Sequence, residues 1–477
     1  MSDSPTSRPR RYAVVGGGVS GLTAAYRLRK LQPHSEVRVF EASARLGGPL
    51  ETTRQGGCLV ERGADSFTTK LPAALELCRE LGLEDELIST NDAHRRALVV
   101  RGGELMPVPE GFVLMKATKL AAVLQTPVLS PLGKLRLMLE PLVARRREAA
   151  DESLASFARR RLGREAFERL VQPLAAGIYT SDGEQLSMAA TMPEFLEAER
   201  EHGSLYAAVR AARRDAAGES GGENSGARYS LFVSLRDGVF RLIERLAEEI
   251  GMERVALGAA ATGLRRVEGG QWEVSFSENG TTELFDGVVL ATPAAATGRL
   301  VAAFDEGLAG LLGQIEAASS TVVSLIYPRE AVGHALDGFG FVSPAREGRA
   351  IIAGSFASVK FTGRAPEGRV VIRAFLGGAV RPDLAELDDE ASVALARDEL
   401  RGLIGAEGDP ETADVRRWTA QMPQYRVGHL GLVEQIEQRV AGLAGLELAG
   451  CSYRGVGIPQ CVASGDRAAQ ALASTDD

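Results

Sequence analysis

Apolar and polar positions alternate in blocks along the chain, and the first blocks predict a compact β-α-β unit. Residues 12–15, YAVV, form an apolar run suited to a buried parallel strand. A glycine-rich turn follows, and apolar positions at helical spacing over 22–31 predict a helix. The run EVRVFEAS, residues 36–43, then predicts a second strand that ends at Glu41.

The later blocks differ in period. RALVVRGGELMPVP, residues 96–109, has two apolar runs around a Gly-Gly pair and predicts a hairpin. Residues 110–210 show mostly helical periodicity, whereas residues 213–228 are polar and glycine-rich and predict a mobile insertion that buries little. Three strand-like runs between 320 and 380 favour an antiparallel sheet.

Two distant segments lead back to the first unit. FDGVVLATPAAA, residues 285–296, reads as a strand that ends in a turn of small residues, and the end of the chain reads as strand, loop and helix. The sequence therefore predicts an α/β protein with a discontinuous Rossmann-like domain, a domain built on an antiparallel sheet and a helical insertion. The expected boundaries are 1–95, 229–300 and 426–477 for the Rossmann-like domain, 96–109 for a hairpin of the antiparallel-sheet domain, 110–228 for the helical part and 301–425 for the antiparallel-sheet domain.

The first turn carries a dinucleotide fingerprint. Gly16, Gly18 and Gly21 satisfy G-x-G-x-x-G, in which the glycines allow a tight turn, close approach to a pyrophosphate and close packing of helix on strand. Glu41 follows Gly21 by 20 residues, where an acid accepts the ribose hydroxyls. A glycine turn without a ligand is the alternative, but strand, turn, helix, strand and acid agree on a dinucleotide.

The residues after this fingerprint, and the lack of a second one, indicate where the electrons come from. Arg45, Gly47 and Gly48 in ARLGG lie just past the ribose acid, where the glycines would admit backbone beside a pyrophosphate and the arginine would add charge. The alternative for this segment is a surface loop. No second fingerprint for a nicotinamide follows a credible strand, so the electrons come from an organic substrate and leave to dioxygen or another acceptor. This favours an oxidase or desaturase over a reductase.

Composition excludes further classes of protein. The chain has 477 residues, 45% hydrophobic, with 55 basic and 63 acidic residues and a formal charge of −8, which argues against a general nucleic-acid binder. The four cysteines lack CxxC spacing and favour a reduced, cytoplasmic protein, and the five histidines form no metal-ligand pair. We expect no signal peptide and no transmembrane helix.

The C-terminal segment AGCSYRGVGIPQCVASGDRAA resembles the signature of oxygen-dependent protoporphyrinogen oxidases within the amine-oxidase-like flavoproteins. The segments GGGVSGL, ARLGG, ERGADSF, QPLAAGIYTSD and GFGFVSP have counterparts in the same order over nearly the whole length. The resemblance implies FAD-dependent oxidation of protoporphyrinogen to protoporphyrin by dioxygen, with release of hydrogen peroxide, as a late step of haem biosynthesis. A flavin amine oxidase or a carotenoid-type desaturase is the alternative.

The resemblance also implies roles for single residues. The expected FAD-binding residues are Gly16, Gly17, Gly18, Val19, Ser20, Gly21, Glu41, Ala42, Arg45, Gly47, Gly48, Gly63, Ala64, Asp65, Ser66, Val255, Trp418, Val456, Gly457 and Ile458. For the substrate, Arg96 would meet a propionate, Gly177 would lie near the reacting carbon, and Phe339 and Val342 would sandwich the macrocycle. A solvated Arg96 beside Arg95 and a Phe339 in the ordinary core are the alternatives.

This chemistry needs few side chains, since the flavin carries it and the pyrrole nitrogens delocalise the charge left behind. We therefore assign no catalytic side chain and no metal ligand. Cys451 suggests covalent attachment of FAD, as in monoamine oxidases, but its surroundings follow the protoporphyrinogen oxidase pattern, so we expect non-covalent FAD.

Residues 111–147 are apolar with interspersed lysines and arginines. They fit either a helical lid packed on the core or a cationic amphipathic surface that touches a membrane, which would make the protein peripheral on the cytoplasmic face. A homodimer is left open.

Overall fold

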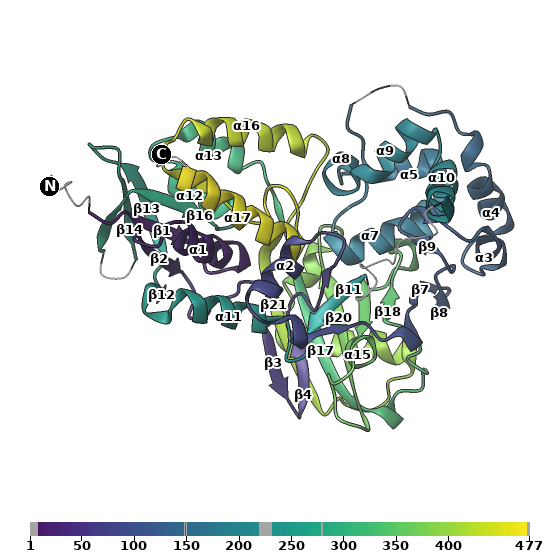
Figure 1. Ribbon diagram of the computed structural model, residues 1–477. Coiled ribbons are helices and arrows are strands. Elements are labelled where there is room, and N and C mark those ends of the chain that lie inside the picture. Colours follow the sequence, from purple (N-terminus) through teal and green to yellow (C-terminus); the bar gives the residue numbers. More distant parts are fainter. Residues whose placement is uncertain (1–7, 147, 149, 219–230, 278–279, 475–477) are drawn as a thin grey trace.

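The computed structural model describes residues 8–146, 148, 150–218, 231–277 and 280–474. Three parts lie side by side: a parallel sheet with its helices, a larger sheet, and a helical part built from the blue-teal stretch of the chain (Figure 1). Both ends of the chain lie on the parallel sheet's side of the molecule (Figure 1).

The parallel sheet is assembled from distant segments, as predicted. Its strand order is β12-β2-β1-β16-β22, and every neighbouring pair is parallel. The strands are β1 (Arg11–Val15), β2 (Glu36–Glu41), β12 (Val255–Leu257), β16 (Gly287–Leu290) and β22 (Leu446–Leu448). The chain order reverses between β1 and β16, and in such sheets ligands bind at the carboxyl ends of the strands at this reversal point.

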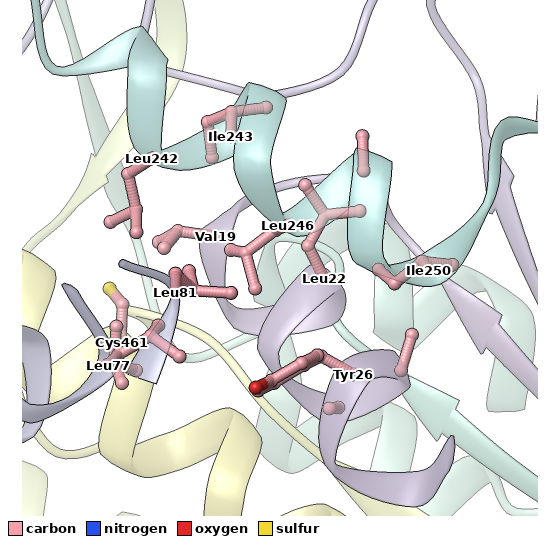
Figure 2. Packing of buried hydrophobic residues seen from close by; sticks show 14 of the residues in the cluster. Val19, Leu22, Tyr26, Leu77, Leu81, Leu242, Ile243, Leu246, Ile250 and Cys461 are labelled. Carbon is pink, nitrogen blue, oxygen red and sulfur yellow. The ribbon is translucent and has the colours of Figure 1, made fainter. Parts of the chain in front are cut away.

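One face of this sheet is covered by helices from four places in the sequence. They are α1 (Val19–Leu31), α2 (Ala73–Glu80), α11 (Phe240–Ile250) and α17 (Ile458–Ser474). Figure 2 shows α1 side chains Val19 and Leu22 among those of α11, with Cys461 of α17 beside them. Each fully buried leucine here contributes about 1.5–3 kcal/mol, so these contacts fix the segments to one another despite their separation in sequence.

The other face carries a small antiparallel sheet and three helices. These elements are β13 (Ala261–Arg266), β14 (Trp272–Phe276), β15 (Thr282–Phe285), α12 (Ala294–Val301), α13 (Glu306–Leu312) and α16 (His429–Ala441). Helix α13 packs in this cluster, and β17, the first strand within the predicted 301–425 segment, begins at Ala317.

The larger sheet has the order β21-β17-β20-β19-β18-β7-β8. Its strands are β7 (Ala97–Arg101), β8 (Glu104–Pro107), β17 (Ala317–Pro328), β18 (Gly340–Val342), β19 (Ala353–Phe356), β20 (Arg369–Gly377) and β21 (Thr412–Pro423). The predicted hairpin forms β7 and β8, with Gly102 and Gly103 at positive φ. The three runs predicted between 320 and 380 form β17, β19 and β20, which pair antiparallel as predicted. The hairpin joins this sheet through β7, which runs parallel to β18.

Alternation along these strands gives the sheet two different faces. Ile372, Ala374 and Leu376 of β20 pack under α15 (Asp389–Ile404). The intervening Arg373 and Phe375 therefore point to the opposite face, toward the rest of the molecule.

The helical part has its own apolar core and confirms the predicted helical insertion. Its helices are α3 (Leu120–Gln125), α4 (Pro131–Met138), α5 (Leu154–Leu162), α6 (Arg164–Ala166), the π-helix η4 (Phe167–Val171), α7 (Gln172–Tyr179), α8 (Met188–Thr191), α9 (Pro193–His202) and α10 (Leu205–Gly218). Most of the expected insertion at 213–228 lies outside the described residues.

Short elements complete the chain. The strands are β3 (Thr52–Gln55), β4 (Cys58–Glu61), β5 (Phe67–Thr68), β6 (Leu87–Ser89), β9 (Phe112–Val113), β10 (Lys116–Ala117) and β11 (Phe232–Leu235), with the helix α14 (Ala357–Lys360). The 3-10 turns are Glu84–Glu86, Asp92–His94, Glu140–Leu142, Met252–Arg254, Arg329–Ala331, Ala345–Glu347 and Pro382–Ala385. Among the described residues no helix is both long and apolar enough to cross a membrane.

Candidate FAD and substrate site

The three fingerprint glycines differ in what a side chain at each position would meet. Gly16 has φ +111°, and a Cβ there would lie 2.5 Å from the carbonyl oxygen of Ala291 on the neighbouring β16 turn. A Cβ on Gly21 would lie 1.9 Å from the carbonyl oxygen of Gly16. At Gly18 a Cβ would meet nothing within 4 Å, so the loop is open where a pyrophosphate would approach.

The start of α1 suits an anion. No acidic residue lies in its first turn, and no side chain caps it at Gly18. Its free N–H groups and the positive end of the helix dipole therefore remain available to phosphate oxygens.

Glu41 lies at the carboxyl end of β2, beside this loop. One carboxylate oxygen accepts from Gly17 N at 2.7 Å and the other from Ser43 N at 2.8 Å. Each oxygen keeps a lone pair for a ribose hydroxyl. Ala42 is exposed next to it, and Val255 of β12 pairs with Val39 of β2, so these predicted FAD-binding residues lie near one edge of the sheet.

The ARLGG segment forms a second loop against the first. Gly47 N donates to Gly17 O at 2.8 Å, and both Gly47 and Gly48 have positive φ. Arg45 donates to Leu46 O at 2.9 Å and pairs with Glu51 at 2.9 Å. The arginine thus braces its own loop, and it shares the Glu51 carboxylate with Arg62 and Arg416, so positive charge is in excess beside the loop.

The Gly63–Ser66 turn is locked to the larger sheet by charge. Asp65 accepts from Lys360 Nζ at 2.8 Å and pairs with Arg373 at 3.1 Å. Burial raises the pKa of Asp65, but these two cations outweigh it and hold the pKa well below the usual range. A Cβ on Gly63 would lie 1.9 Å from Pro49 O, so the turn also requires glycine.

Trp418 joins this turn from β21. Its indole N–H donates to Arg62 O at 2.8 Å, and a Cβ on Gly63 would lie 3.4 Å from its ring. Arg45 lies 5.7 Å from the ring centroid, within cation–π range. The structure therefore brings together Trp418, Gly63 and Arg45, which the sequence placed at the cofactor separately.

The C-terminal loop bridges two parts of the molecule. Ile458 is buried in the cluster around α1 and α17, whereas Val456 packs against the core of the helical part. Helix α17 crosses α1 closely, since a Cβ on Gly465 would lie 2.2 Å from Ser20 O. Val456, Gly457 and Ile458 thus lie between the dinucleotide loop and the helical part.

The predicted substrate residues fall into two neighbouring pairs. Gly177, near the end of α7, faces Val342 of β18, and a Cβ on the glycine would lie 3.4 Å from Val342 Cγ1. Phe339 N donates to Arg96 O at 2.9 Å, so these two residues meet where β18 runs beside β7. The Arg96 guanidinium is half exposed and ion-pairs with Asp337.

Sequence reasoning missed residues that the sheet register adds to this site. Val342 pairs with Ala353, Ala353 with Phe375, and Phe375 with Val322. Directly paired residues share a face, so Phe375 and Val322 belong to the same surface as Val342. The alternation in VVIRAFLG was the available signal, because Arg373 and Phe375 are out of phase with Ile372, Ala374 and Leu376, which face α15.

Within the described part of the chain, no group of three histidine, cysteine, aspartate or glutamate side chains is arranged to hold a metal ion. The residues present do fit a dinucleotide: an open Gly18, an uncapped helix start and a carboxylate at the ribose position.

Comparisons with known proteins agree with this geometry. Residues 19–473 match the family model described as flavin containing amine oxidoreductase. The chain is 34% identical to coproporphyrinogen III oxidase of Propionibacterium freudenreichii subsp. freudenreichii over 97% of this chain and 91% of the relative. It is 30% identical to coproporphyrinogen III oxidase of Bacillus subtilis (strain 168), over 96% and 97% of the two chains.

More distant relatives point the same way. The chain is 29% identical to protoporphyrinogen oxidase 1, chloroplastic, of Arabidopsis thaliana, over 94% of this chain and 85% of the relative. A crystal structure from Exiguobacterium sp. 255-15, provisionally named a protoporphyrinogen oxidase, superposes with a TM-score of 0.86 at 29% identity, covering 98% and 99% of the two chains.

Proposed function

The chain belongs to the flavin containing amine oxidoreductase family, and from this premise we propose that it oxidises a porphyrinogen to the porphyrin with dioxygen as acceptor. FAD is the cofactor, as predicted. The observation that carries the proposal is the full-length similarity to porphyrinogen oxidases, at 30–34% identity for coproporphyrinogen III oxidases.

The overall reaction balances without a second cofactor. A porphyrinogen gives up six electrons in three two-electron steps, and three dioxygen molecules become three of hydrogen peroxide. When bound, FAD supplies this chemistry by accepting a hydride from a bridging carbon and passing the electrons to dioxygen.

The residues of this chain hold and orient the two reactants. The glycine loop and Glu41 hold the dinucleotide end of the cofactor. Gly177 of α7 and Val342 of β18 meet where the helical part lies against the larger sheet, and their small or apolar surfaces would suit the flat face of a tetrapyrrole. Orientation of the two reactants would supply the rate enhancement, since the reaction needs no side-chain acid or base.

Two porphyrinogens compete as substrate. Coproporphyrinogen III carries four propionates, and it appears in the names of the relatives at 30% identity or more. Protoporphyrinogen, with two propionates, is the second candidate, since the C-terminal motif resembles its oxidases and chloroplastic relatives are 28–29% identical. We place coproporphyrinogen III first.

Anaerobic mixing tests the proposal directly. Either porphyrinogen should bleach the flavin absorption of the purified protein, while primary amines and carotenoid precursors should not. In air, about three equivalents of peroxide should accompany each porphyrin formed, as the six-electron stoichiometry requires. The ratio of kcat/KM for the two porphyrinogens ranks them. Bleaching by amines alone would overturn the proposal in favour of an amine oxidase.

We also propose that the protein works at the surface of the cytoplasmic membrane. The segment from α4 to the turn Glu140–Leu142 exposes Leu132, Leu135, Leu139 and Leu142 at 78%, 57%, 42% and 79%. Lys134 and the exposed Arg145 flank these leucines. An apolar stripe with basic neighbours fits an anionic lipid surface, from which protoporphyrinogen, the less soluble of the two candidates, could be taken up.

A further inference from the structure

Tyr425 connects three parts of the molecule through one side chain. It lies just after β21, is 2% exposed, and packs in the apolar core of the helical part. Its hydroxyl donates to Cys451 O at 2.5 Å and accepts from Gly455 N at 2.7 Å. One phenol therefore closes both ends of the turn that precedes Val456.

The segment that carries Tyr425 is itself fixed. Ser187 N donates to Tyr425 O at 2.8 Å, and Val427 N donates to Gln185 O at 2.9 Å. The ring stacks on His429, with centroids 4.0 Å apart and planes at 15°. Because backbone and ring are both held, the hydroxyl is a fixed point for the turn.

The groups around the turn support the same arrangement. His429 Nε2 lies 2.8 Å from Tyr453 O and donates to it, since a carbonyl can only accept. Burial lowers the pKa of His429, so the ring is neutral, and burial raises the pKa of Tyr425, so the phenol keeps its proton.

The turn lies where a bound FAD must pass. The residues that follow it, Val456 and Ile458, bridge the helical part and the cluster that contains Val19 of the dinucleotide loop. An FAD held at that loop would extend past these residues toward the helical part.

We infer that Tyr425 is a positioning residue: its hydroxyl sets the Cys451–Gly455 turn and, through it, the wall that Val456, Gly457 and Ile458 present to the flavin. The inference rests on FAD binding at the glycine loop and not on which substrate is oxidised. Tyr425 also lines a cavity of about 500 Å³ between the helical part and the larger sheet.

The test compares Tyr425→Phe with Tyr327→Phe. The first keeps the ring and its stacking and removes both hydrogen bonds. Tyr327 is fully buried on the α15 side of the larger sheet, and its hydroxyl has no hydrogen-bond partner within the described residues, so its loss is a matched control. FAD affinity, the visible absorption and circular dichroism of the flavin, and its midpoint potential are measured on both variants and the wild type.

We expect Tyr425→Phe to raise the FAD Kd about tenfold, as the loss of two modest hydrogen bonds would, and to alter the flavin circular dichroism. Trypsin should also cut faster after Arg454, which is exposed within the turn. Tyr327→Phe should change neither.

A Tyr425→Phe protein with wild-type FAD affinity, flavin spectrum and potential would overturn the inference. So would a variant that only lost thermal stability or gained cleavage at Arg454, because the tyrosine would then hold the fold and not the flavin. No substrate enters these measurements, so their outcome is independent of the porphyrinogen proposal.

Discussion

Gly177 of α7 and Val342 of β18 face each other so closely that a Cβ on the glycine would lie 3.4 Å from Val342 Cγ1. The glycine is exposed although it lies within a helix, and Val342 is only partly buried. The pair therefore marks a close contact between α7 and the larger sheet that is partly open to solvent and not enclosed in the core.

The first prediction concerns this contact between Gly177 and Val342. Gly177→Ala should not lower thermal stability, because alanine favours the helix by about 1 kcal/mol over glycine. It should lower kcat/KM for the porphyrinogen by roughly 1–3 kcal/mol, the cost of crowding a well-fitted slot. Steady-state kinetics and thermal unfolding measure the two effects.

Gly431→Ala is the matched control, since Gly431 lies in α16 with nothing within 4 Å of a built Cβ. It should match the stability gain without the kinetic loss. Unchanged kinetics in Gly177→Ala would show that the substrate does not reach Gly177.

The second prediction concerns Glu41. Its carboxylate already holds the dinucleotide loop through Gly17 N and has capacity left for the ribose. Glu41→Ala should weaken FAD binding by roughly 1.5–3 kcal/mol, the usual range for hydrogen bonds to a charged group. Fluorescence titration of the apoprotein gives the Kd. Glu36→Ala, at the other end of the same strand, should leave the Kd unchanged.

The third prediction concerns attachment of the cofactor. Neither Cys451 nor Cys461 is in a disulfide, and the Cys461 thiol donates to Val456 O at 4.0 Å. Acid precipitation should therefore release all the flavin into the supernatant, from the wild type and from Cys451→Ser alike. Flavin that stays with the denatured wild-type chain but not with the variant would establish a covalent bond to Cys451.

The site could be predicted from sequence only where it is local. Gly16, Gly18 and Glu41 act within one β-α-β unit, so spacing along the chain was enough to assign them. Lys360 and Arg373 contact Asp65 although they lie 295 and 308 residues away in the sequence. No residue near Asp65 in the sequence predicts these partners. Such partners depend on how two separate sheets come together.

Arg45 shows a second limit of prediction from sequence, because its partners could not be predicted. Its position was predicted correctly beside the glycine loops, but its partners are Glu51 and backbone carbonyls of its own segment. Spacing identifies which residue is near a ligand. Which way a long side chain turns depends on the charges that folding brings beside it.

The fourth prediction concerns the exposed leucines. The double variant Leu132→Ser, Leu142→Ser should lose at least tenfold in affinity for vesicles that contain anionic lipid, because each leucine contributes about 1.5–3 kcal/mol when buried. Cosedimentation with anionic and with neutral vesicles measures the change. Leu257→Ser, Leu284→Ser removes two exposed leucines elsewhere and should bind as the wild type does.

A different outcome would reassign this surface. If neither lipid binds the wild type and the leucine variant alone changes its elution volume on size exclusion, the leucines form a contact between two copies of the chain.

The last prediction concerns Arg96. The guanidinium donates to Asp337 O at 2.6 Å and ion-pairs with the Asp337 carboxylate, and its side chain is 48% exposed. A propionate can replace this carboxylate, since both offer the same pair of acceptors to the guanidinium. Arg96→Ala should therefore raise KM and lower kcat/KM by roughly 1.5–3 kcal/mol, with FAD content unchanged.

Two further variants decide whether Arg96 binds substrate or only holds Asp337. Asp337→Asn removes the competing carboxylate and should lower KM, the opposite of Arg96→Ala. Arg95, whose partner is Asp92 at 2.5 Å, lies before the start of β7, and Arg95→Ala should leave KM near the wild-type value. If Arg96→Ala and Asp337→Asn shift KM in the same direction, or not at all, the two residues form a structural ion pair at the start of the hairpin. The propionates would then be held by other cations of the site.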